Sequence, residues 1–350
     1  MVSRAGRNPG RNARRSDNPR HGDTGEGMPK IRITQLDGAL PNIALMKLSH
    51  WHKSQGDEVH FSKTWERQLF EPEYDVVYGS AIFQWTKAKL DRFLTEFPNA
   101  IVGGTGTKSK MTIEDVTGGP YEFFDYSIYP KFERSIGFSQ RGCRLACKFC
   151  VVPGKEGKNK DNGPINRIWR GEPYPKEIIL LDNDFFGQPD WQEKAEEILD
   201  GDFKVNFNQG MNARLIHEEG AKMLKEMQFF EAKFKYRRLH TAWDNPKDEK
   251  LFFKGLNILM DAGIKPREIM VYMLIGYWPG ETMDDILWRF NKLNDSGCLP
   301  YPMVYDQNNP ELKKFQRWVN RRYYQFVPWE KYDSSMRSRP PKDQLTFNYA

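Results

Sequence analysis

Three of the four cysteines in this 350-residue chain lie within eight residues of one another, at Cys143, Cys147 and Cys150. A disulfide framework normally spreads its cysteines along the chain, so this C-x3-C-x2-C spacing indicates ligands for a metal ion or an iron–sulfur cluster. Three thiolates on one loop are enough to bind three irons of a [4Fe–4S] cubane, which leaves the fourth iron without a protein ligand. Metal chemistry on a substrate needs such an open position, whereas structural sites are closed.

Two other kinds of cysteine site fit the sequence less well. A structural zinc site would need a histidine beside the three cysteines, and no histidine lies between His60 and His217. A ferredoxin-type cluster would need a fourth cysteine nearby, at a different spacing. The fourth cysteine, Cys298, would serve only if the fold brought it back to the loop, and we interpret it as an ordinary buried or reduced thiol.

The cysteine loop, with Phe149 directly before its last cysteine, resembles the signature of the radical S-adenosylmethionine (SAM) enzymes. The resemblance implies a [4Fe–4S] cluster whose open iron binds SAM. An electron from the reduced cluster then cleaves SAM to a 5′-deoxyadenosyl radical, which takes a hydrogen from the substrate. The resemblance also implies a one-electron reductant such as a flavodoxin or a ferredoxin. The substrate, a small molecule or a nucleic acid, and the reaction, a methylation or another modification, stay open.

The elements that position this loop alternate between strands and helices from residue 30 onward. In the first run we expect strands at residues 31–36, 58–61, 75–80 and 100–102 and helices at residues 43–53 and 87–97. Alternation of this kind predicts βαβ units and a parallel sheet. We therefore expect a doubly wound, Rossmann-like βα domain over residues 29–128.

A second run of βα units contains the cysteines. Its expected strands are residues 135–139, 177–182, 204–208, 238–243, 269–276 and 301–305, and its expected helices are residues 191–199, 217–227, 247–262 and 283–294. Six strands within roughly 170 residues fit a partial (β/α)6 barrel better than a complete eight-stranded one. The expected fold is thus α/β, with the Rossmann-like domain followed by a radical SAM barrel over residues 129–309. In such folds the active-site residues follow the carboxyl ends of strands.

Residues at these strand ends are the candidates for binding SAM. Asp182, Asn183 and Asp184 follow the second strand, where the superfamily commonly has a Gly-Gly-Glu segment that binds the SAM amino group, and this sequence departs from it. The resemblance adds four candidates after the later strands: Gln209, Arg214, Asp244 and Gly276. Caps of the next helix, turns and salt bridges are the alternative roles for the polar residues.

Gly276 opens a segment, residues 276–282, that looks like the Gly-x-Pro-Gly-Glu-Thr turn of many radical SAM proteins with one extra residue. A glycine there would let adenine approach the backbone. Glu281 and Thr282 are expected to begin the next helix.

The first domain resembles the cobalamin-binding-like domains of one subgroup of the superfamily, in segments 41–45 and 102–106. Glycines after a strand, here Gly103 and Gly104, either let a backbone approach a cofactor or build a tight turn. The cobalamin and turn interpretations both stay open on the sequence.

One departure bears on cobalamin directly. The Asp-x-His-x-x-Gly motif that supplies a cobalt ligand in many such domains does not occur here. His50 and His52 fall inside an expected helix, where structural or surface roles are expected. The domain therefore binds cobalamin without a protein ligand, binds something else, or has lost cofactor binding.

The basic charge of the chain lies toward its two ends. Lys and Arg number 53 and Asp and Glu 47, for a net charge of +6. Residues 1–28 carry +3 and residues 310–350 carry +5, which leaves −2 for the 281 residues between them. We expect a disordered basic arm over residues 1–28 and a C-terminal amphipathic helix with a basic tail over residues 310–350. Solvated tails and nucleic-acid contact both explain such a pattern.

The C-terminal helix is predicted from two stripes at helical spacing, one apolar (Leu312, Phe315, Val319, Tyr323 and Phe326) and one basic (Lys313, Arg317 and Arg321). Basic and aromatic residues together suit nucleic-acid binding, but a helix packing its aromatic residues on the barrel has the same pattern. The lysines of loop 154–160 likewise suit phosphate contact or a solvated loop. The alternative function is therefore a non-catalytic iron–sulfur or zinc protein that binds nucleic acid through its basic termini.

Composition narrows the class of protein. Hydrophobic residues make up 39% and aromatic residues 14% of the chain, which does not fit a disordered or collagen-like protein. The longest apolar stretch, residues 269–278, covers ten residues where a membrane-spanning helix needs about 20. The N-terminus lacks the apolar run of a secretory signal. We expect a cytoplasmic protein without a membrane segment.

Overall fold

The computed structural model describes residues 27–336, which form a mixed α/β protein built on parallel sheets. The expected α/β class is therefore confirmed. The predicted arm, residues 1–28, falls outside the described residues except for its last two. Residues 337–350 of the predicted basic tail lie outside them as well.

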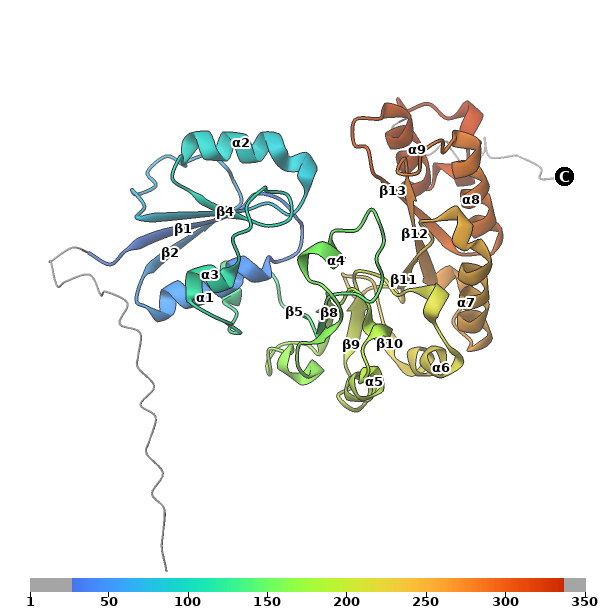
Figure 1. Ribbon diagram of the computed structural model, residues 1–350, viewed down its shortest axis with the longest axis horizontal. Helices are drawn as coiled ribbons and strands as arrows, with labels where there is room; N and C mark the ends of the chain where they lie inside the picture. Colours follow the sequence, from blue (N-terminus) through green and yellow to red (C-terminus); the bar gives the residue numbers. More distant parts are fainter. Residues whose placement is uncertain (1–26, 337–350) are drawn as a thin grey trace, which may run out of the picture.

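The first sheet contains four parallel strands in the order β2-β1-β3-β4. They are β1 (Lys30–Gln35), β2 (Glu58–Ser62), β3 (Val76–Ser80) and β4 (Ile101–Gly103). Helix α2 (Lys87–Glu96) covers one face, while α1 (Ile43–Ser54) and the short α3 (Ile113–Thr117) lie on the other (Figure 1). The strand order reverses between β1 and β3, and ligands of open α/β sheets bind beside such a reversal, at the carboxyl ends of the strands.

The remaining parallel strands form two adjoining sheets, with the orders β10-β9-β8-β5 and β11-β12-β13. Their bounds are β5 (Ser135–Gly137), β8 (Glu177–Leu180), β9 (Lys204–Phe207), β10 (Gln228–Phe229), β11 (Leu239–Ala242), β12 (Ile269–Ile275) and β13 (Leu299–Val304). A bridge between Met211 and Thr241 joins the two sheets. All six strands predicted for this region are present, while β10 is too short to show any periodicity in the sequence.

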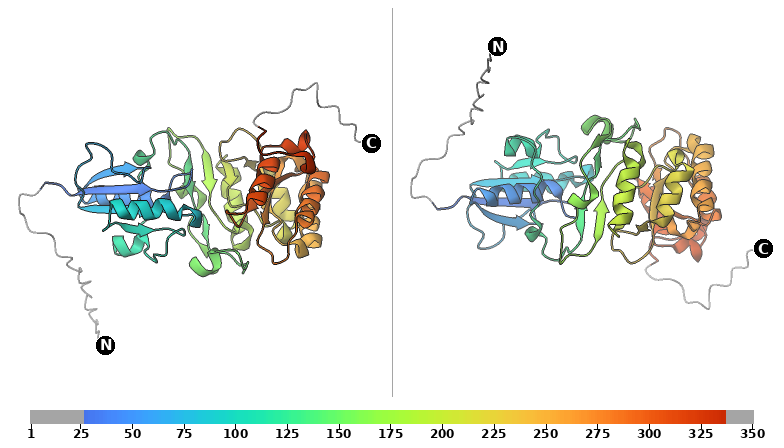
Figure 2. Two further views of the ribbon diagram at one scale, coloured as in Figure 1. Left: turned by 90° about the horizontal axis from the view of Figure 1, so that it is seen from above. Right: turned by 90° about the horizontal axis from the view of Figure 1, so that it is seen from below.

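Helices follow five of these strands and cover the outside of the sheets (Figure 1). They are α5 (Trp191–Asp200), α6 (Glu218–Glu226), α7 (Glu249–Asp261), α8 (Met283–Asp295) and α9 (Pro310–Asn320). Helix α6 begins one residue later than predicted because His217 caps it, with its ring Nδ1 accepting the Gly220 N–H at 3.1 Å. Figure 2 shows the first sheet at one end of an elongated molecule and the C-terminal helices at the other.

The core explains why these sequences form strands. Along β12 the side chains of Ile269, Val271, Met273 and Ile275 are fully buried and alternate with partly buried neighbours, which is the period-two pattern of a strand. One apolar cluster surrounds the two adjoining sheets. A second cluster joins the first sheet to them, since it contains Ile33 and Tyr78 from the first sheet and Ile136 and Ile179 from β5 and β8.

The C-terminal helix is shorter than its apolar stripe predicted. Helix α9 ends at Asn320, and Arg322 then adopts the left-handed conformation with φ 59°, which a continuing right-handed helix does not allow. The last two residues of the stripe, Tyr323 and Phe326, therefore lie beyond the helix, and the single-helix prediction was wrong for them.

The aromatic residues of this region pack inward. Phe315, Trp318 and Tyr323 are buried in the core. Arg317, from the predicted basic stripe, donates to the Tyr332 hydroxyl at 2.5 Å and to the Ser334 carbonyl at 2.7 Å. Packing, rather than a surface for stacking bases, accounts for the interleaved aromatic residues. Between residues 27 and 336, the helices lack the combined length and apolar character that crossing a membrane would demand.

Candidate functional site

The cysteine loop is closed at its base by a short antiparallel pair that the sequence did not predict. Strands β6 (Gln140–Arg141) and β7 (Lys160–Asp161) flank it, and the short helix α4 (Val152–Lys155) lies inside it. Gly142 has φ 79°, and a Cβ there would lie 2.2 Å from the Lys158 carbonyl oxygen. Only glycine fits at this crossing, so the loop folds back on itself directly before its first cysteine.

The three loop cysteines are free thiols near the surface. Cys143 and Cys147 are half-buried and Cys150 is exposed. Burial raises the pKa of the Cys143 thiol, and the charges of Asp184, Cys147 and Cys150 act in the same direction.

The thiols do not converge on a single point. Among residues 27–336, no three His, Cys, Asp or Glu side chains are grouped so that they could hold one metal ion. A single zinc ion needs its cysteine sulfurs within about 2.3 Å of itself. A cubane cluster instead takes each thiolate on a different iron atom.

The fourth cysteine is far from the loop in the fold. Cys298 is buried in the main apolar cluster and directly precedes β13, at the amino end of that strand. The cysteine loop follows β5, at the carboxyl end of the same parallel arrangement. Cys298 is therefore a buried thiol, as interpreted from the sequence, and the other three thiols lie on the loop.

Asp182, one of the predicted SAM-binding residues, contacts the start of the cysteine loop. Its carboxylate accepts the N–H groups of Ser139 at 2.8 Å and Gln140 at 3.1 Å, and also the Ser139 hydroxyl. Burial raises the pKa of Asp182 to about 6 although these hydrogen bonds favour the charged form. The side chain thus holds the start of the cysteine loop to the end of β8.

Asn183 and Asp184 contact the loop itself. Asp184 pairs with Arg144, one residue after the first cysteine, with Nε and Oδ2 2.9 Å apart. Asn183 donates at 3.1 Å to Glu156, which in turn accepts from the Gly142 N–H at 3.0 Å. The alternative of capping the next helix does not hold for these residues, because their side chains fasten the cysteine loop to the end of β8.

The three polar residues predicted after the later strands lie in three different environments. Gln209 is exposed at the end of β9. Arg214 pairs with Asp248, the salt-bridge role left open by the sequence. Asp244 accepts the Leu274 N–H at 2.8 Å, and burial raises its pKa. Burial also raises the pKa of Cys150, and the charge of Asp244 acts in the same direction. Among these three residues, Asp244 is the one whose charge acts on a loop cysteine.

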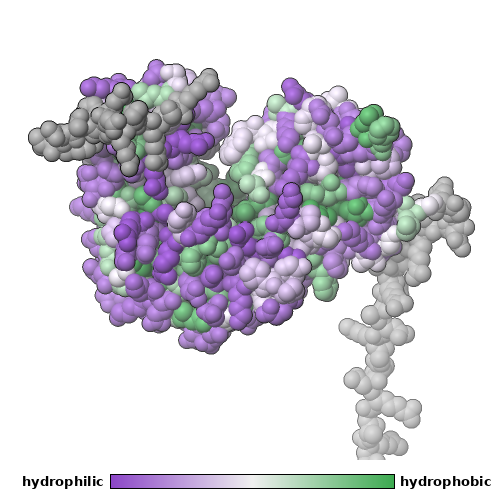
Figure 3. All heavy atoms as spheres, turned by 180° about the vertical axis from the view of Figure 1, so that it is seen from behind, coloured by the Kyte–Doolittle hydropathy of each residue, from purple (hydrophilic) through white to green (hydrophobic). Residues whose placement is uncertain are grey.

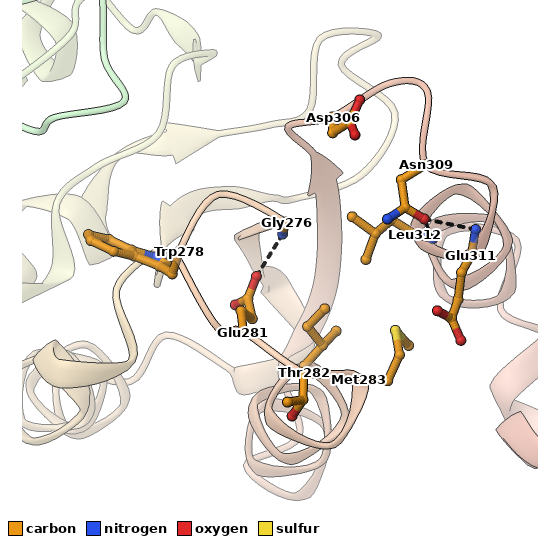
Figure 4. Close-up of a pocket in the computed structure, with 10 residues that line it drawn as sticks. Gly276, Trp278, Glu281, Thr282, Met283, Asp306, Asn309, Glu311 and Leu312 are labelled. Atoms are coloured by element: carbon orange, nitrogen blue, oxygen red, sulfur yellow. Dashed lines mark hydrogen bonds between the residues drawn. The ribbon is translucent and has the colours of Figure 1, made fainter.

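Gly276 lies in a pocket of about 400 Å³ at the end of β12 (Figure 4). Its φ is 78°, and a Cβ there would lie 2.3 Å from Leu312 Cδ1. Its N–H donates to Glu281 at 2.6 Å, and Glu281 forms a fully buried ion pair with Arg289. The close approach that the sequence indicated is therefore present, but α9 makes it. Thr282 caps α8 as predicted.

An aromatic group joins this pocket to the cysteine loop. Tyr277 contacts Phe149 at 5.4 Å, Trp278 at 5.1 Å and Tyr305 at 4.9 Å between ring centroids. Neither Tyr277 nor Tyr305 is among the site residues predicted from the sequence. The available signal was their position, since each follows the end of a strand.

At the carboxyl edge of the first sheet, a carboxylate of the protein bridges the crevice between the loops that follow β1 and β3. Asp37, after β1, accepts the N–H groups of Ile82 at 2.8 Å and Phe83 at 2.9 Å and the hydroxyl of Thr86 at 2.7 Å, all after β3. The two loops that flank the reversal of strand order are therefore tied together by one carboxylate.

The predicted glycines lie beside this bridge. Gly104 has φ 101°, and a Cβ there would lie 2.3 Å from the Ala81 carbonyl oxygen. The Gly103 carbonyl accepts the Ala81 N–H at 3.1 Å. The tight-turn interpretation accounts for Gly104, whereas Gly103 is the last residue of β4 and its hydrogen bond does not require a glycine. Because the crevice is bridged and its glycines contact backbone, these residues do not fit a cobalamin tail, and we assign cobalamin no part below.

The two histidines of α1 have structural partners. His52 is buried between Asp57, with Nδ1 and Oδ2 2.6 Å apart, and the Tyr78 hydroxyl, 3.1 Å from Nε2. Burial lowers its pKa. His50 lies 2.7 Å from the Tyr121 hydroxyl. Both have the structural role expected from their place in a helix.

A direct contact links the two carboxyl edges. Lys155 Nζ, in α4 of the cysteine loop, lies 2.8 Å from the Thr105 hydroxyl, which follows β4 of the first sheet. In Figure 1, α4 stands between the first sheet and the strands β11 to β13. The cysteine loop is therefore the meeting point of the three sheets.

No protein-family model matches this chain, and no curated protein is significantly similar to it in sequence. The residues and geometry of the cysteine loop and its surroundings are therefore the basis for assigning a function.

Proposed function

We propose that this protein is a radical SAM enzyme that binds a [4Fe–4S] cluster through Cys143, Cys147 and Cys150. The observation that carries the proposal is the position of the thiols: three on one loop at the carboxyl end of β5, and the fourth at the opposite edge. Such a donor set leaves one iron open to a ligand from outside the protein.

The arrangement of the sheets supports the finer fold that this proposal requires. The six strands β5, β8, β9, β11, β12 and β13 run parallel within their sheets and succeed one another in chain order, with helices outside. We infer a partial (β/α)6 barrel. The first sheet, with its reversal of strand order and helices on both faces, is in our proposal a doubly wound domain.

When bound, the cluster and SAM supply the radical chemistry, and the protein supplies binding and orientation. The side chains of Asp182, Asp184 and Glu156 hold the cysteine loop to the ends of β5 and β8. Asp244 and the exposed Gln209 are the predicted residues that remain available to contact SAM. The electron comes from a one-electron reductant such as a flavodoxin or a ferredoxin.

Anaerobic reconstitution with iron and sulfide tests the proposal. We expect about four irons per chain, the content of a cubane. We also expect 5′-deoxyadenosine and methionine from SAM after reduction with dithionite. Cys147→Ala should lose both the cluster and the cleavage, whereas the matched control Cys298→Ala should keep both.

Two outcomes would overturn the proposal. If no cluster forms, the loop is not an iron–sulfur site. If a cluster forms but does not cleave SAM after reduction, the protein belongs to the non-catalytic class instead. Loss of the cluster in Cys298→Ala would show that the ligand set is wrong.

A further inference from the structure

Two loops around the candidate site hold a local excess of positive charge. Residues 141–160 contain six Lys and Arg and one acidic residue, and residues 104–112 contain two Lys and no acidic residue. These 29 residues, which we call the basic loops, carry +7, whereas residues 29–309 as a whole carry −2. Positive charge is therefore in local excess beside the cysteines, within a stretch of chain that is otherwise slightly acidic.

Most of this charge is not neutralised by the protein. Arg141 pairs with Glu156 and Arg144 with Asp184. The five lysines Lys108, Lys110, Lys148, Lys158 and Lys160 are exposed, and no carboxylate within residues 27–336 forms an ion pair with any of them. A concentration of like charge repels itself, and a bound polyanion relieves that repulsion.

The basic loops are adjacent in space. The Lys155–Thr105 hydrogen bond joins them, and each follows the carboxyl end of a strand, β4 in one case and β5 in the other. Figure 3 shows the surface hollowed between the two lobes of the molecule. The shape of this region suits an extended chain better than the convex face of a globular partner.

An exposed aromatic platform, formed by Trp85 and Phe83, lies beside the basic loop of residues 104–112. Trp85 is 61% exposed and stacks on Phe83, with ring centroids 4.4 Å apart and an angle of 12° between the planes. Asp37 fixes this turn through the Phe83 N–H. Gly106, in the basic loop, packs against the Phe83 backbone, where a Cβ would lie 2.4 Å from the carbonyl oxygen. A large aromatic ring is thus held rigidly with one face open to solvent.

We propose that the substrate of this site is a single-stranded nucleic acid, with its phosphates bound by the lysines of the basic loops and a base stacked on Trp85. Single-strand binding sites have two components: basic side chains that line the path of the nucleic acid's phosphate backbone, and aromatic rings on which the bases stack. The proposal rests on the proposed function for its chemistry, because the bound strand lies beside the cysteine loop. Binding itself requires neither the cluster nor SAM.

Fluorescence anisotropy with labelled 20-nucleotide RNA and DNA tests the proposal on the full-length, reconstituted protein. We expect Lys108→Glu/Lys110→Glu to weaken binding at least tenfold. The slope of log affinity against log salt should fall by about 1.4, since each phosphate contact to a single strand contributes about 0.7. The matched control is Lys250→Glu/Lys254→Glu, which makes the same charge change on the exposed face of α7 and should bind as the wild type does.

The aromatic platform has its own test. Trp85→Ala should weaken binding several-fold without changing the salt slope, and Trp85→Phe should retain most of the affinity. Binding of neither RNA nor DNA, or equal losses in the loop variant and the α7 control, would overturn the proposal. So would loss of flavodoxin-dependent reduction in Lys108→Glu/Lys110→Glu with nucleic-acid binding intact, because the loops would then serve the electron donor. Production of 5′-deoxyadenosine is measured separately, so a failure of the proposed function is distinguishable.

Discussion

The ring of Phe149, directly before the last loop cysteine, meets the ring of Tyr277 edge to face at 5.4 Å. Tyr277 follows β12, so this contact ties the cysteine loop to the far side of the strand arrangement, opposite the anchors on β8. The loop is thus held from two sides, by polar contacts at one and by aromatic packing at the other.

The aromatic contact should limit motion of the cysteine loop. An aromatic pair of this kind contributes about 0.5–1.5 kcal/mol beyond the area it buries. We expect Tyr277→Ala to speed backbone hydrogen exchange at residues 143–150 by about three- to tenfold, measured by mass spectrometry. Tyr277→Phe retains the ring and should exchange at the wild-type rate. Unchanged exchange in Tyr277→Ala would show that the polar anchors alone hold the loop.

The carboxylate of Asp182 should be needed for the loop to bind iron. Asp182→Ala leaves the N–H groups of Ser139 and Gln140 without their acceptor, and a buried donor left unsatisfied costs about 1–3 kcal/mol. We expect less than half the wild-type iron content after reconstitution. Asp182→Asn keeps an acceptor oxygen and should retain most of the iron. Full iron content in the alanine variant would contradict the positioning role.

The buried pair of Glu281 and Arg289 should be strongly coupled. Both side chains are almost fully buried, and Arg289 also donates to the Leu274 carbonyl at 2.9 Å. Arg289→Met leaves the Glu281 charge buried without its partner, which costs about 3–5 kcal/mol. Urea unfolding should show that Glu281→Gln/Arg289→Met is more stable than Arg289→Met alone. If the losses of unfolding free energy from the two substitutions simply add up in the double variant, the two side chains are not coupled.

Replacing a glycine can cost stability through backbone strain and through a clash of the added Cβ. Gly104 and Gly118 allow these two effects to be measured separately. Both have positive φ, 101° and 75°, but a Cβ at Gly104 meets the Ala81 carbonyl at 2.3 Å while one at Gly118 meets nothing within 4 Å. Gly118→Ala should therefore lose about 1 kcal/mol from backbone strain alone. Gly104→Ala should lose clearly more in the same thermal unfolding experiment. Equal losses would mean that the turn after β3 moves aside freely.

Stability should fall in acid partly through Asp125. Burial alone would raise the pKa of this carboxyl, but hydrogen bonds from Lys53, Ser127 and Ser49 outweigh it and lower the pKa to about 2. A pKa depressed in the folded state gives stability that is complete above the ordinary value near 4 and is lost as the pH falls toward 2. The difference in unfolding free energy between wild type and Asp125→Asn should be on the order of 2 kcal/mol at pH 6 and shrink below pH 4. A difference independent of pH would contradict this assignment.

Much of the fold could be predicted because its signals are local. The alternation of Ile269, Val271, Met273 and Ile275 marks β12 on the sequence alone, and a Thr282–Asp285 capping box marks the start of α8. The two-residue strands β6 and β7 and the four-residue helix α4 carry no such period and were missed. The left-handed residue that ends α9 has no local signal either, because Arg322 is an unusual choice there.

The positions of the candidate site residues could be predicted from the sequence, but the residues that they contact could not. Asp182 and Asp184 were expected at the carboxyl end of their strand, and they lie there. Their partners, Ser139 and Arg144, are about 40 residues earlier in the chain, and no spacing rule reaches that far. Gly276 shows the same limit, since its need for a close approach was evident while the partner, Leu312, depended on how α9 packs.

Because Cys298 is buried and the three loop cysteines are not, the four thiols fall into two classes that differ in their accessibility to reagents. Its side chain is 3% exposed, whereas Cys150 is open to solvent and Cys143 and Cys147 are half-buried. An alkylating reagent applied to the native protein will therefore modify loop thiols first, and Cys298 only after denaturation. A loop thiol that reacts in the metal-free protein but escapes the reagent after reconstitution is occupied, so comparing the two labelling stoichiometries reports ligation at the loop, with Cys298 as the internal standard in the same molecule.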